Sequence, residues 1–273
     1  QKQIISLVSN ELLKNENLKN PALIKAEEAS PLEKDFLAEH FLANQSFNQA
    51  HAGEAFILDQ TGEFLTTINM KDHLHLQILD CQGEIESAWA RLVKIETSLG
   101  KAINYSFLPK FGFLTADPTR CGTALRAAAF LQVPALIHQG KIDDFLEKHA
   151  DESLLITGIQ GNPTEIIGDV LTIENNYTLG LTEETILSTI RSFATKLHVE
   201  ENSARSKIKH SESADFKDKI SRAFGILIHS YQIEAVEALN ALSLLKLGAE
   251  LGWVKGVSSK ELNQLLSYGY LRR

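Results

Sequence analysis

The 273-residue sequence has only two cysteines, one methionine and no long apolar run. Cys81 and Cys121 stand far apart and in no metal-ligand spacing, which predicts free thiols and a reducing compartment. A membrane-spanning helix needs about 18 or more consecutive apolar residues, and no stretch approaches that length. No signal-peptide pattern is present either, so we expect a soluble, cytoplasmic protein that does not contact a membrane.

Positive charge is also scarce. The chain has 27 basic and 35 acidic residues and a net charge of −8, so we do not expect a general nucleic-acid surface. Hydrophobic residues make up 44% of the chain, which is ample for the core of one large domain or two small ones. The sequence opens with Gln1 and not with an initiator methionine, so we expect a piece of a longer protein.

Apolar spacing predicts an α+β fold with a mostly antiparallel sheet flanked by helices. Three parts are expected: a helical N-terminal part over residues 1–50, an antiparallel-sheet core over 51–210, and a C-terminal helical part over 211–273 that packs on the core. Helices are predicted over residues 3–15, 31–42, 84–98, 121–131, 140–149, 182–207, 215–230, 233–251 and 259–267. Strands are predicted over residues 54–59, 63–69, 72–80, 103–107, 111–115, 153–159 and 167–174.

Two local signals are specific. Ser30-Pro31-Leu32-Glu33 is typical of a helix start, with Ser30 as the N-cap and Glu33 closing a capping box. Gln60-Thr61-Gly62 between two apolar runs predicts a hairpin turn with a positive φ at Gly62.

The stretch that carries the most chemistry runs from Ile68 to Gln77 and reads I-N-M-K-D-H-L-H-L-Q. In the strand predicted from Asp72 onward, alternation places His73 and His75 on one face. Two imidazoles beside an acidic residue indicate a metal or acid–base site. A half-polar strand whose histidines serve only structure explains the same pattern.

This stretch resembles the N-E-E-D-H-L-R-[IV] signature of the guanidino kinases (ATP:guanido phosphotransferases), and most closely that of the bacterial protein arginine kinases. Met70 and Lys71 stand where the family has two glutamates, and His75 stands where it has arginine. The positions that agree are Asn69, Asp72, His73, Leu74 and Gln77.

A second stretch, from Phe113 to Ala127, resembles G-[YF]-L-T-[AS]-C-P-[ST]-N-[VL]-G-T-G-[LM]-R-A of the same family. Asp117 stands at the reactive cysteine and Arg120 at the asparagine, whereas Arg126 is kept and by resemblance holds nucleotide phosphate. From the residues alone, Arg126 lies in or opens a helix just after Gly122 and Thr123, where it either holds an anion or caps a core helix.

A third stretch, from Ile156 to Glu165, resembles V-R-G-x-x-G-E-G-[ST]-E. Thr157 replaces the phosphate-binding arginine and Asn162 replaces the substrate-loop glutamate, while Gly158 and Gly161 are kept. The following D-V-L-T-I-E-N matches a family strand that usually ends I-S-N. Further matches at Ser30–Leu42, Ser221–Leu227 and Leu244–Gly252 extend the resemblance from about Gln3 to Leu262.

The resemblance implies phosphorylation of arginine with Mg·ATP, and a zinc-containing activator protein as partner in stress response and protein quality control. That chemistry needs carboxylates that orient the guanidinium and accept its proton, and arginines that neutralise the phosphates. Both are largely substituted. The positions to which the resemblance assigns nucleotide contacts are His75, Arg120, Arg126, Thr157, Gly158 and Gly161.

Three interpretations follow. The first is an inactive kinase-like protein, a pseudokinase, that acts by binding a partner protein or a second copy of itself. The second is retained nucleotide or phosphoarginine binding in a rearranged basic pocket formed by Lys71, His75, Arg120 and Arg126. The third is an active enzyme, either a rewired kinase with Asp72 or Asp117 as base, or a metal enzyme built on His73, His75 and Asp117.

Overall fold

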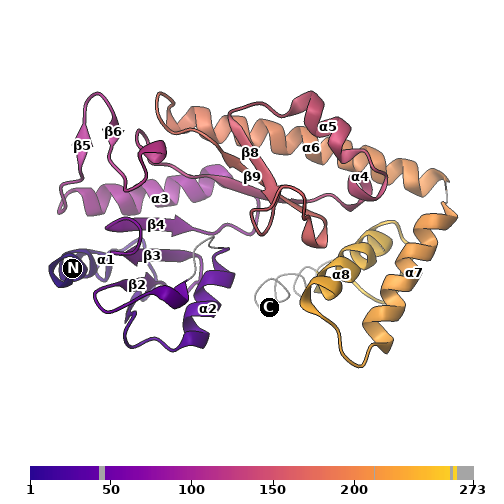
Figure 1. Cartoon of the computed structure of the whole chain (residues 1–273), viewed down its shortest axis with the longest axis horizontal. Coiled ribbons are helices and arrows are strands. Elements are labelled where there is room, and N and C mark those ends of the chain that lie inside the picture. The colour runs from indigo at the N-terminus through magenta and orange to yellow at the C-terminus, as the bar shows by residue number, and fades with distance from the viewer. Residues whose placement is uncertain (43–46, 212, 259–260, 263–273) are drawn as a thin grey trace. The chain divides into compact units, whose positions relative to one another are not determined.

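The computed structural model of the chain describes residues 1–42, 47–211, 213–258 and 261–262 (Figure 1). It has two compact units, one made of Gln1–Leu125 and Thr178–Leu187, the other of Arg126–Tyr177 and Ser188–Arg273. Helices lie against antiparallel sheets in both, so the α+β class predicted from sequence is confirmed. Among the described residues, no helix is both long enough and apolar enough to cross a membrane.

The first unit is built on a four-stranded antiparallel sheet in the order β1-β2-β3-β4. Its strands are β1 (Ala22–Lys25), β2 (Ala55–Leu58), β3 (Phe64–Ile68) and β4 (Leu74–Ile78). Its helices are α1 (Lys2–Leu12), α2 (Pro31–His40) and α3 (Ile85–Gly100), with short 3₁₀ turns η1 (Phe47–Gln49) and η2 (Pro118–Arg120). A separate two-stranded hairpin, β5 (Phe107–Leu108) and β6 (Gly112–Phe113), follows α3.

Both faces of the four-stranded sheet carry apolar clusters, because its strands alternate two sets of buried side chains. Ile57, Phe64 and Ile68 pack with residues of α1 and α3 on one face. On the other face, Phe56 and Leu65 pack with residues of α2 and η1. The sheet is therefore the central layer of this unit, between helices (Figure 1).

The two local signals are confirmed in this unit. The Ser30 hydroxyl accepts a hydrogen bond from the Glu33 amide at 3.3 Å, and the Glu33 carboxylate accepts one from the Ser30 amide at 2.8 Å. Gly62 has a φ of +71° in the turn between β2 and β3, a conformation that costs glycine little.

The second unit has a three-stranded antiparallel sheet in the order β7-β9-β8. Its strands are β7 (Ala128–Gln132), β8 (Leu154–Gly158) and β9 (Val170–Asn175), the last preceded by the 3₁₀ turn η3 (Ile167–Asp169). Its helices are α4 (Pro134–His138), α5 (Ile142–His149), α6 (Glu183–Ser211) from Ser188 onward, α7 (Ala214–His229) and α8 (Ala235–Glu250). The helix predicted over residues 259–267 falls mostly outside the described residues.

The helix predicted over residues 121–131 is wrong. Residues 128–132 form β7, paired with β9 from Ala128 opposite Glu174 to Gln132 opposite Val170. The alanine-rich stretch has a high helix propensity, but pairing with a buried strand outweighs propensity. Arg126 therefore precedes a strand and does not lie in or open a helix.

Three further differences from the predicted elements are smaller. Helix α4, which was not predicted, begins at Pro134, where the missing N–H of proline costs nothing in the first helical turn. Strand β1, over Ala22–Lys25, was not predicted. Strand β4 begins at Leu74 and not at Asp72, so His73 lies in the preceding turn and does not share a strand face with His75.

Candidate functional site

The turn between β3 and β4 is organised by Asn69, the first residue of the signature. Asn69 is buried with a φ of +60°, a left-handed conformation that asparagine tolerates better than most residues. Its side-chain amide donates hydrogen bonds to the Gly53 carbonyl at 2.9 Å and the Gln1 carbonyl at 3.1 Å. The His73 ring Nδ1 lies 3.1 Å from the Asn69 side-chain oxygen. Asn69 and His73, two positions that agree with the signature, thus hold the turn together.

The next two residues, Met70 and Lys71, replace the glutamates of the signature and have different surroundings. Met70 is half-buried and packs against the apolar cluster of α2 and η1, beside Leu79. Lys71 is exposed, and its ammonium lies 3.3 Å from a carboxylate oxygen of Asp117. Neither side chain offers a proton acceptor.

Asp117 stands where the family has its cysteine, and it caps the 3₁₀ turn η2. Its carboxylate accepts hydrogen bonds from the Thr119 hydroxyl at 2.7 Å and the Thr119 amide at 3.1 Å. These bonds, together with the nearby Lys71 ammonium, lower the pKa of Asp117 to about 2. Asp117 is therefore ionised at neutral pH and is a weak base.

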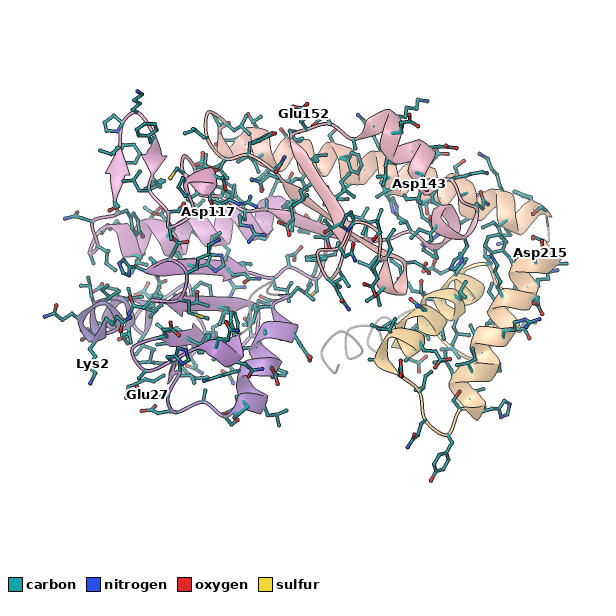
Figure 2. All side chains as sticks on the ribbon, in the orientation of Figure 1. Lys2, Glu27, Asp117, Asp143, Glu152 and Asp215 are labelled. Atoms are coloured by element: carbon teal, nitrogen blue, oxygen red, sulfur yellow. The ribbon has the colours of Figure 1, made fainter. Side chains whose placement is uncertain are left out.

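A second contact joins the same two segments. The Asp72 carboxylate accepts a hydrogen bond of 2.6 Å from the Ala116 amide. Asp72 and Lys71 therefore attach the turn before β4 to the segment before η2, at consecutive positions on each side. The two segments that carry the first two sequence motifs form one local structure within the first unit; Asp117 is labelled in Figure 2.

The rest of the second motif is tightly packed. Gly122 has a φ of +106°, and a Cβ atom there would lie 2.5 Å from the Thr178 carbonyl oxygen. The Thr178 hydroxyl donates to the Cys121 carbonyl at 2.7 Å, and Cys121 is a half-buried free thiol. Arg120 is half-buried at the end of η2. The glycine of this motif is needed for close backbone packing.

His75 lies on β4 opposite Thr67, with an exposed side chain. The signature glutamine, Gln77, donates from its side chain to the Phe41 carbonyl at 2.6 Å. The metal alternative built on His73, His75 and Asp117 is not supported. Among the described residues, no three histidine, cysteine or acidic side chains are grouped so as to hold a metal ion.

In the second unit, Arg126 forms an ion pair with Glu174. Their side chains meet at 2.6 Å between Nη2 of Arg126 and Oε2 of Glu174. The arginine side chain is 41% exposed, but that of Glu174 is only 11% exposed, so the carboxylate is largely shielded from water. Arg126 thus has a fixed counter-charge within the chain.

The third motif forms the end of β8 and a closed loop. Thr157 is buried and lies opposite Thr172 of β9. The Gly158 amide donates to the Asn162 carbonyl at 2.8 Å, and a Cβ atom on Gly158 would lie 2.0 Å from the Glu165 carbonyl oxygen. The exposed Asn162 side chain accepts from the Thr164 amide at 3.1 Å. Asn162 therefore serves its own loop, as does Gly161, which has a φ of +80°.

Sequence reasoning missed Glu174 as part of this set. The available signal was its position, since Glu174 stands at the serine of the family's I-S-N strand ending. The contact joins residues 48 positions apart, so no local pattern predicts it.

Comparison with known proteins tests the resemblance. The model of the ATP:guanido phosphotransferase C-terminal catalytic domain matches residues 3–204, and that of the protein-arginine kinase McsB C-terminal domain matches residues 213–268. The chain belongs to the ATP:guanido phosphotransferase family.

Curated relatives are protein-arginine kinases. That of Chlamydia pneumoniae is 38% identical over 82% of this chain and 62% of its own length. That of Halothermothrix orenii is 32% identical over 89% of this chain and 70% of its own length. The chain therefore spans less than two thirds of the Chlamydia pneumoniae relative.

Solved structures of the ATP:guanido phosphotransferase family share the fold. A lombricine kinase matches with a TM-score of 0.63 at 20% identity, over 76% of this chain and 60% of its own. A duplicated taurocyamine kinase from Schistosoma mansoni matches with a TM-score of 0.63 at 21% identity, over 74% of this chain and 29% of its own.

Proposed function

We propose that this member of the protein-arginine kinase family does not phosphorylate arginine and acts by binding partner proteins. The observation that carries the proposal is that two cationic side chains of its motifs, Lys71 and Arg126, form ion pairs inside the chain. Lys71 pairs with Asp117 and Arg126 pairs with Glu174. In each pair at least one partner is a substitution relative to the family pattern.

The first argument concerns proton removal. An arginine guanidinium is protonated at any physiological pH, so its phosphorylation requires a well-placed base. The glutamate positions hold Met70, Lys71 and Asn162. Lys71 would repel a guanidinium, and Asn162 already accepts a hydrogen bond from Thr164.

The alternative of a rewired kinase, with Asp72 or Asp117 as the base, also lacks an effective proton acceptor. A general base works best when its pKa lies near the operating pH. Asp117, with a pKa of about 2, accepts a proton poorly at neutral pH. Asp72 is engaged by the Ala116 amide.

The second argument concerns phosphate. Preorganised cations stabilise the transferring phosphoryl group, and removing one such donor typically costs about 10²–10³ in rate. His75 and Thr157 replace two of the three motif arginines. The third, Arg126, has Glu174 as counter-charge. We therefore expect no measurable phosphoryl transfer.

For the role that remains, we propose a partner surface in protein quality control and stress regulation, in the cytoplasm. The partner class is a zinc-containing activator protein of the family type, with a homodimer as the alternative assembly. A partner surface that is separate from the catalytic residues does not require them, because function resides in sites and not in the fold as such.

The test is incubation with Mg·ATP labelled on the γ-phosphate and an arginine-rich protein substrate, followed by measurement of acid-labile label. The Chlamydia pneumoniae protein-arginine kinase, assayed in parallel, is the positive control. We expect label only with the control enzyme. Label on arginine from this chain, abolished by Asp117→Asn, would overturn the proposal.

A second candidate, retained nucleotide binding, is favoured by the 41% exposure of Arg126, which leaves part of the guanidinium open to an anion. A ligand at about a hundred times its Kd stabilises a protein by about 2.7 kcal/mol, which is several degrees of thermal midpoint. A shift with saturating Mg·ADP that is lost in Arg126→Ala would support this candidate. No shift in either protein would refute it.

A further inference from the structure

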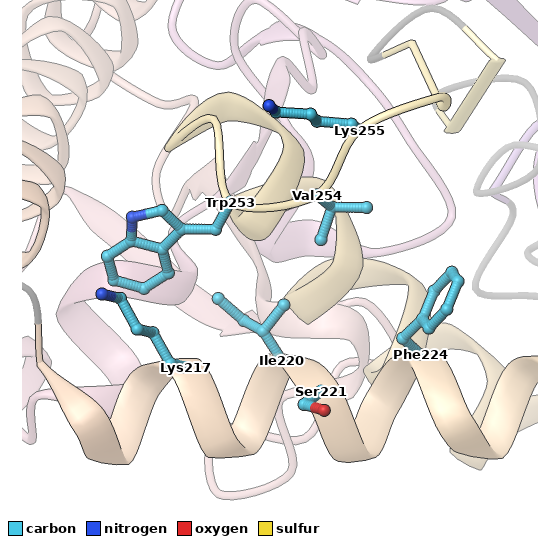
Figure 3. A pocket seen from close by; sticks show the side chains of 7 residues that line it. All are labelled: Lys217, Ile220, Ser221, Phe224, Trp253, Val254 and Lys255. Atoms are coloured by element: carbon cyan, nitrogen blue, oxygen red, sulfur yellow. The ribbon is translucent and has the colours of Figure 1, made fainter.

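The C-terminal region has a pocket that is separate from the three motif stretches of the candidate site. It lies between α7 and the segment that follows α8, with a cavity volume of about 530 Å³ (Figure 3). That volume falls in the range of about 300–1,000 Å³ typical of ligand pockets. Its lining residues are Lys217, Ile220, Ser221, Phe224, Trp253, Val254 and Lys255.

The α7 wall follows from helical spacing. Lys217, Ile220, Ser221 and Phe224 stand at i, i+3, i+4 and i+7, so their side chains share one face of the helix. Phe224 is 40% exposed, so part of its ring is accessible to a ligand in the pocket.

The opposite wall is made by the way α8 ends. Gly252 has a φ of +79°, and its amide donates to the Ala249 carbonyl at 3.0 Å. The Trp253 amide donates to the Gly248 carbonyl at 2.9 Å. This pair of bonds is the Schellman motif, and it turns Trp253 and the next residue, Val254, back towards α7.

The floor of the pocket depends on a missing side chain. A Cβ atom on Gly248 would lie 2.5 Å from Cγ2 of Ile220 and 3.0 Å from Cγ2 of Val254. Glycine at this position of α8 therefore allows Ile220 and Val254 to approach each other. The two walls are held at a fixed separation by close packing.

The charges of the pocket have one sign. Among the described residues that line it, the ionisable ones are Lys217 and Lys255, in a chain whose net charge is −8. The Lys217 ammonium lies 5.3 Å from the centre of the Trp253 ring, a cation–π contact visible in Figure 3. Within the described part of the chain, Lys255 makes no ion pair.

We propose that this pocket binds a short segment of a partner protein in which an apolar side chain is flanked by acidic residues. The apolar walls of Ile220, Phe224 and Val254 take the apolar side chain, and Lys217 and Lys255 take the flanking carboxylates. Buried aromatic anchors with charged rims are the common arrangement of peptide and protein interfaces.

A free inorganic anion fits less well. Arginine forks bind phosphate in bidentate geometry, and no described residue of the lining is an arginine. Four apolar side chains would face such an anion without donating hydrogen bonds to it. The acidic–apolar segment uses both the walls and the lysines.

This inference rests on the proposed partner-binding role and names a surface for it. A failure of the peptide-binding inference can be distinguished from a failure of the partner-binding role, because none of the described lining residues belongs to the candidate site. Phosphorylation of arginine would overturn the role and leave the pocket untouched.

The probe is an array of hexapeptides with two central apolar positions and flanks that are all acidic, all basic or all serine. Binding to the full chain is followed by Trp253 fluorescence in a Trp89→Phe background. We expect binding only with acidic flanks, and weakening when added salt screens the lysines.

Two variants sharpen the test. Lys217→Glu and Lys255→Glu should each weaken binding about tenfold, since each reverses a charge that faces the ligand. Lys219→Glu makes the same change on α7 at a position that does not line the pocket, and it should leave binding unchanged. Circular dichroism of each variant checks that the helices are intact.

Three outcomes would overturn the proposal. The first is a failure of acidic-flanked peptides to bind at about 1 mM, a concentration well above the Kd of roughly 100 µM expected for a weak peptide ligand. An equal effect of Lys219→Glu would show a general charge effect. The third is that inorganic phosphate displaces serine-flanked and acidic-flanked peptides alike. That result would show a site that binds anions and does not recognise the apolar side chain of the peptide.

Discussion

The Arg126 guanidinium and the Glu174 carboxylate, 48 positions apart in the sequence, approach to 2.6 Å between Nη2 and Oε2. Glu174 lies opposite Ala128, the first residue of β7, and Arg126 precedes that strand by two residues. The pairing of β7 with β9 therefore brings the two residues close together.

Truncation of Arg126 should lower stability. Arg126→Ala leaves the shielded Glu174 carboxylate without its counter-charge, and we expect a loss of about 1–2 kcal/mol, reduced from fully buried values because Arg126 is 41% exposed. Urea unfolding of the two proteins measures this loss in the free energy of unfolding. Glu174→Gln is the matched control: in that background, Arg126→Ala should cost clearly less. An equal cost in both backgrounds would contradict the pairing.

The acid dependence of stability should reveal Asp117. Its folded pKa of about 2 lies below the unfolded value of about 3.9, so ionised Asp117 stabilises the fold above pH ~4, and this contribution is lost as pH falls towards 2. The measurement is the midpoint of urea unfolding at a series of pH values from 7 to 2.5. Below pH 4, this midpoint should fall less steeply with decreasing pH in Asp117→Asn than in the unsubstituted chain. Parallel curves would show that the Thr119 and Lys71 contacts do not form.

Thr66 should be better replaced by valine. Its hydroxyl is buried in β3 and has no hydrogen-bond partner among the described residues, with Ile57 and Leu76 opposite it on the neighbouring strands. Burying an unpaired hydroxyl costs about 1–3 kcal/mol, so Thr66→Val, which keeps the shape, should stabilise by about 1 kcal/mol. Thermal unfolding should then shift upwards by about 2–4 °C. A decrease would show that the hydroxyl has a partner in solution.

Gly122 should tolerate no side chain. Gly122→Ala forces a Cβ atom to 2.5 Å from the Thr178 carbonyl oxygen at a φ of +106°. We expect a cost above about 2 kcal/mol. The matched control is Gly83→Ala, also at a positive φ of +80° but with no atom within 4 Å of the added methyl group, which should cost about 1 kcal/mol. Equal costs would assign the effect to backbone conformation alone.

The sequence predicted the elements whose causes are local. The capping box of Ser30 and the positive φ of Gly62 depend on neighbours within a few residues, and both are present. The family resemblance extended this to the whole fold, which local signals alone do not specify.

The failures involve partners distant in sequence. Residues 121–131 have helical composition, and only pairing with β9 makes 128–132 a strand. The contacts of Lys71 with Asp117 and of Arg126 with Glu174 span 46 and 48 positions. A list of substituted motif positions shows which groups are lost, but it does not show that the substituting residues bind one another.

The Lys71–Asp117 contact has a consequence for how this chain could change over time. A single return to the family pattern at residue 71 would bring a second carboxylate to a site that already holds Asp117, and the two like charges would repel. A single return at residue 117 would leave the Lys71 ammonium without its acidic neighbour. The two positions are therefore coupled: a change at either one alone replaces an attractive pair by a repulsive or unpaired charge.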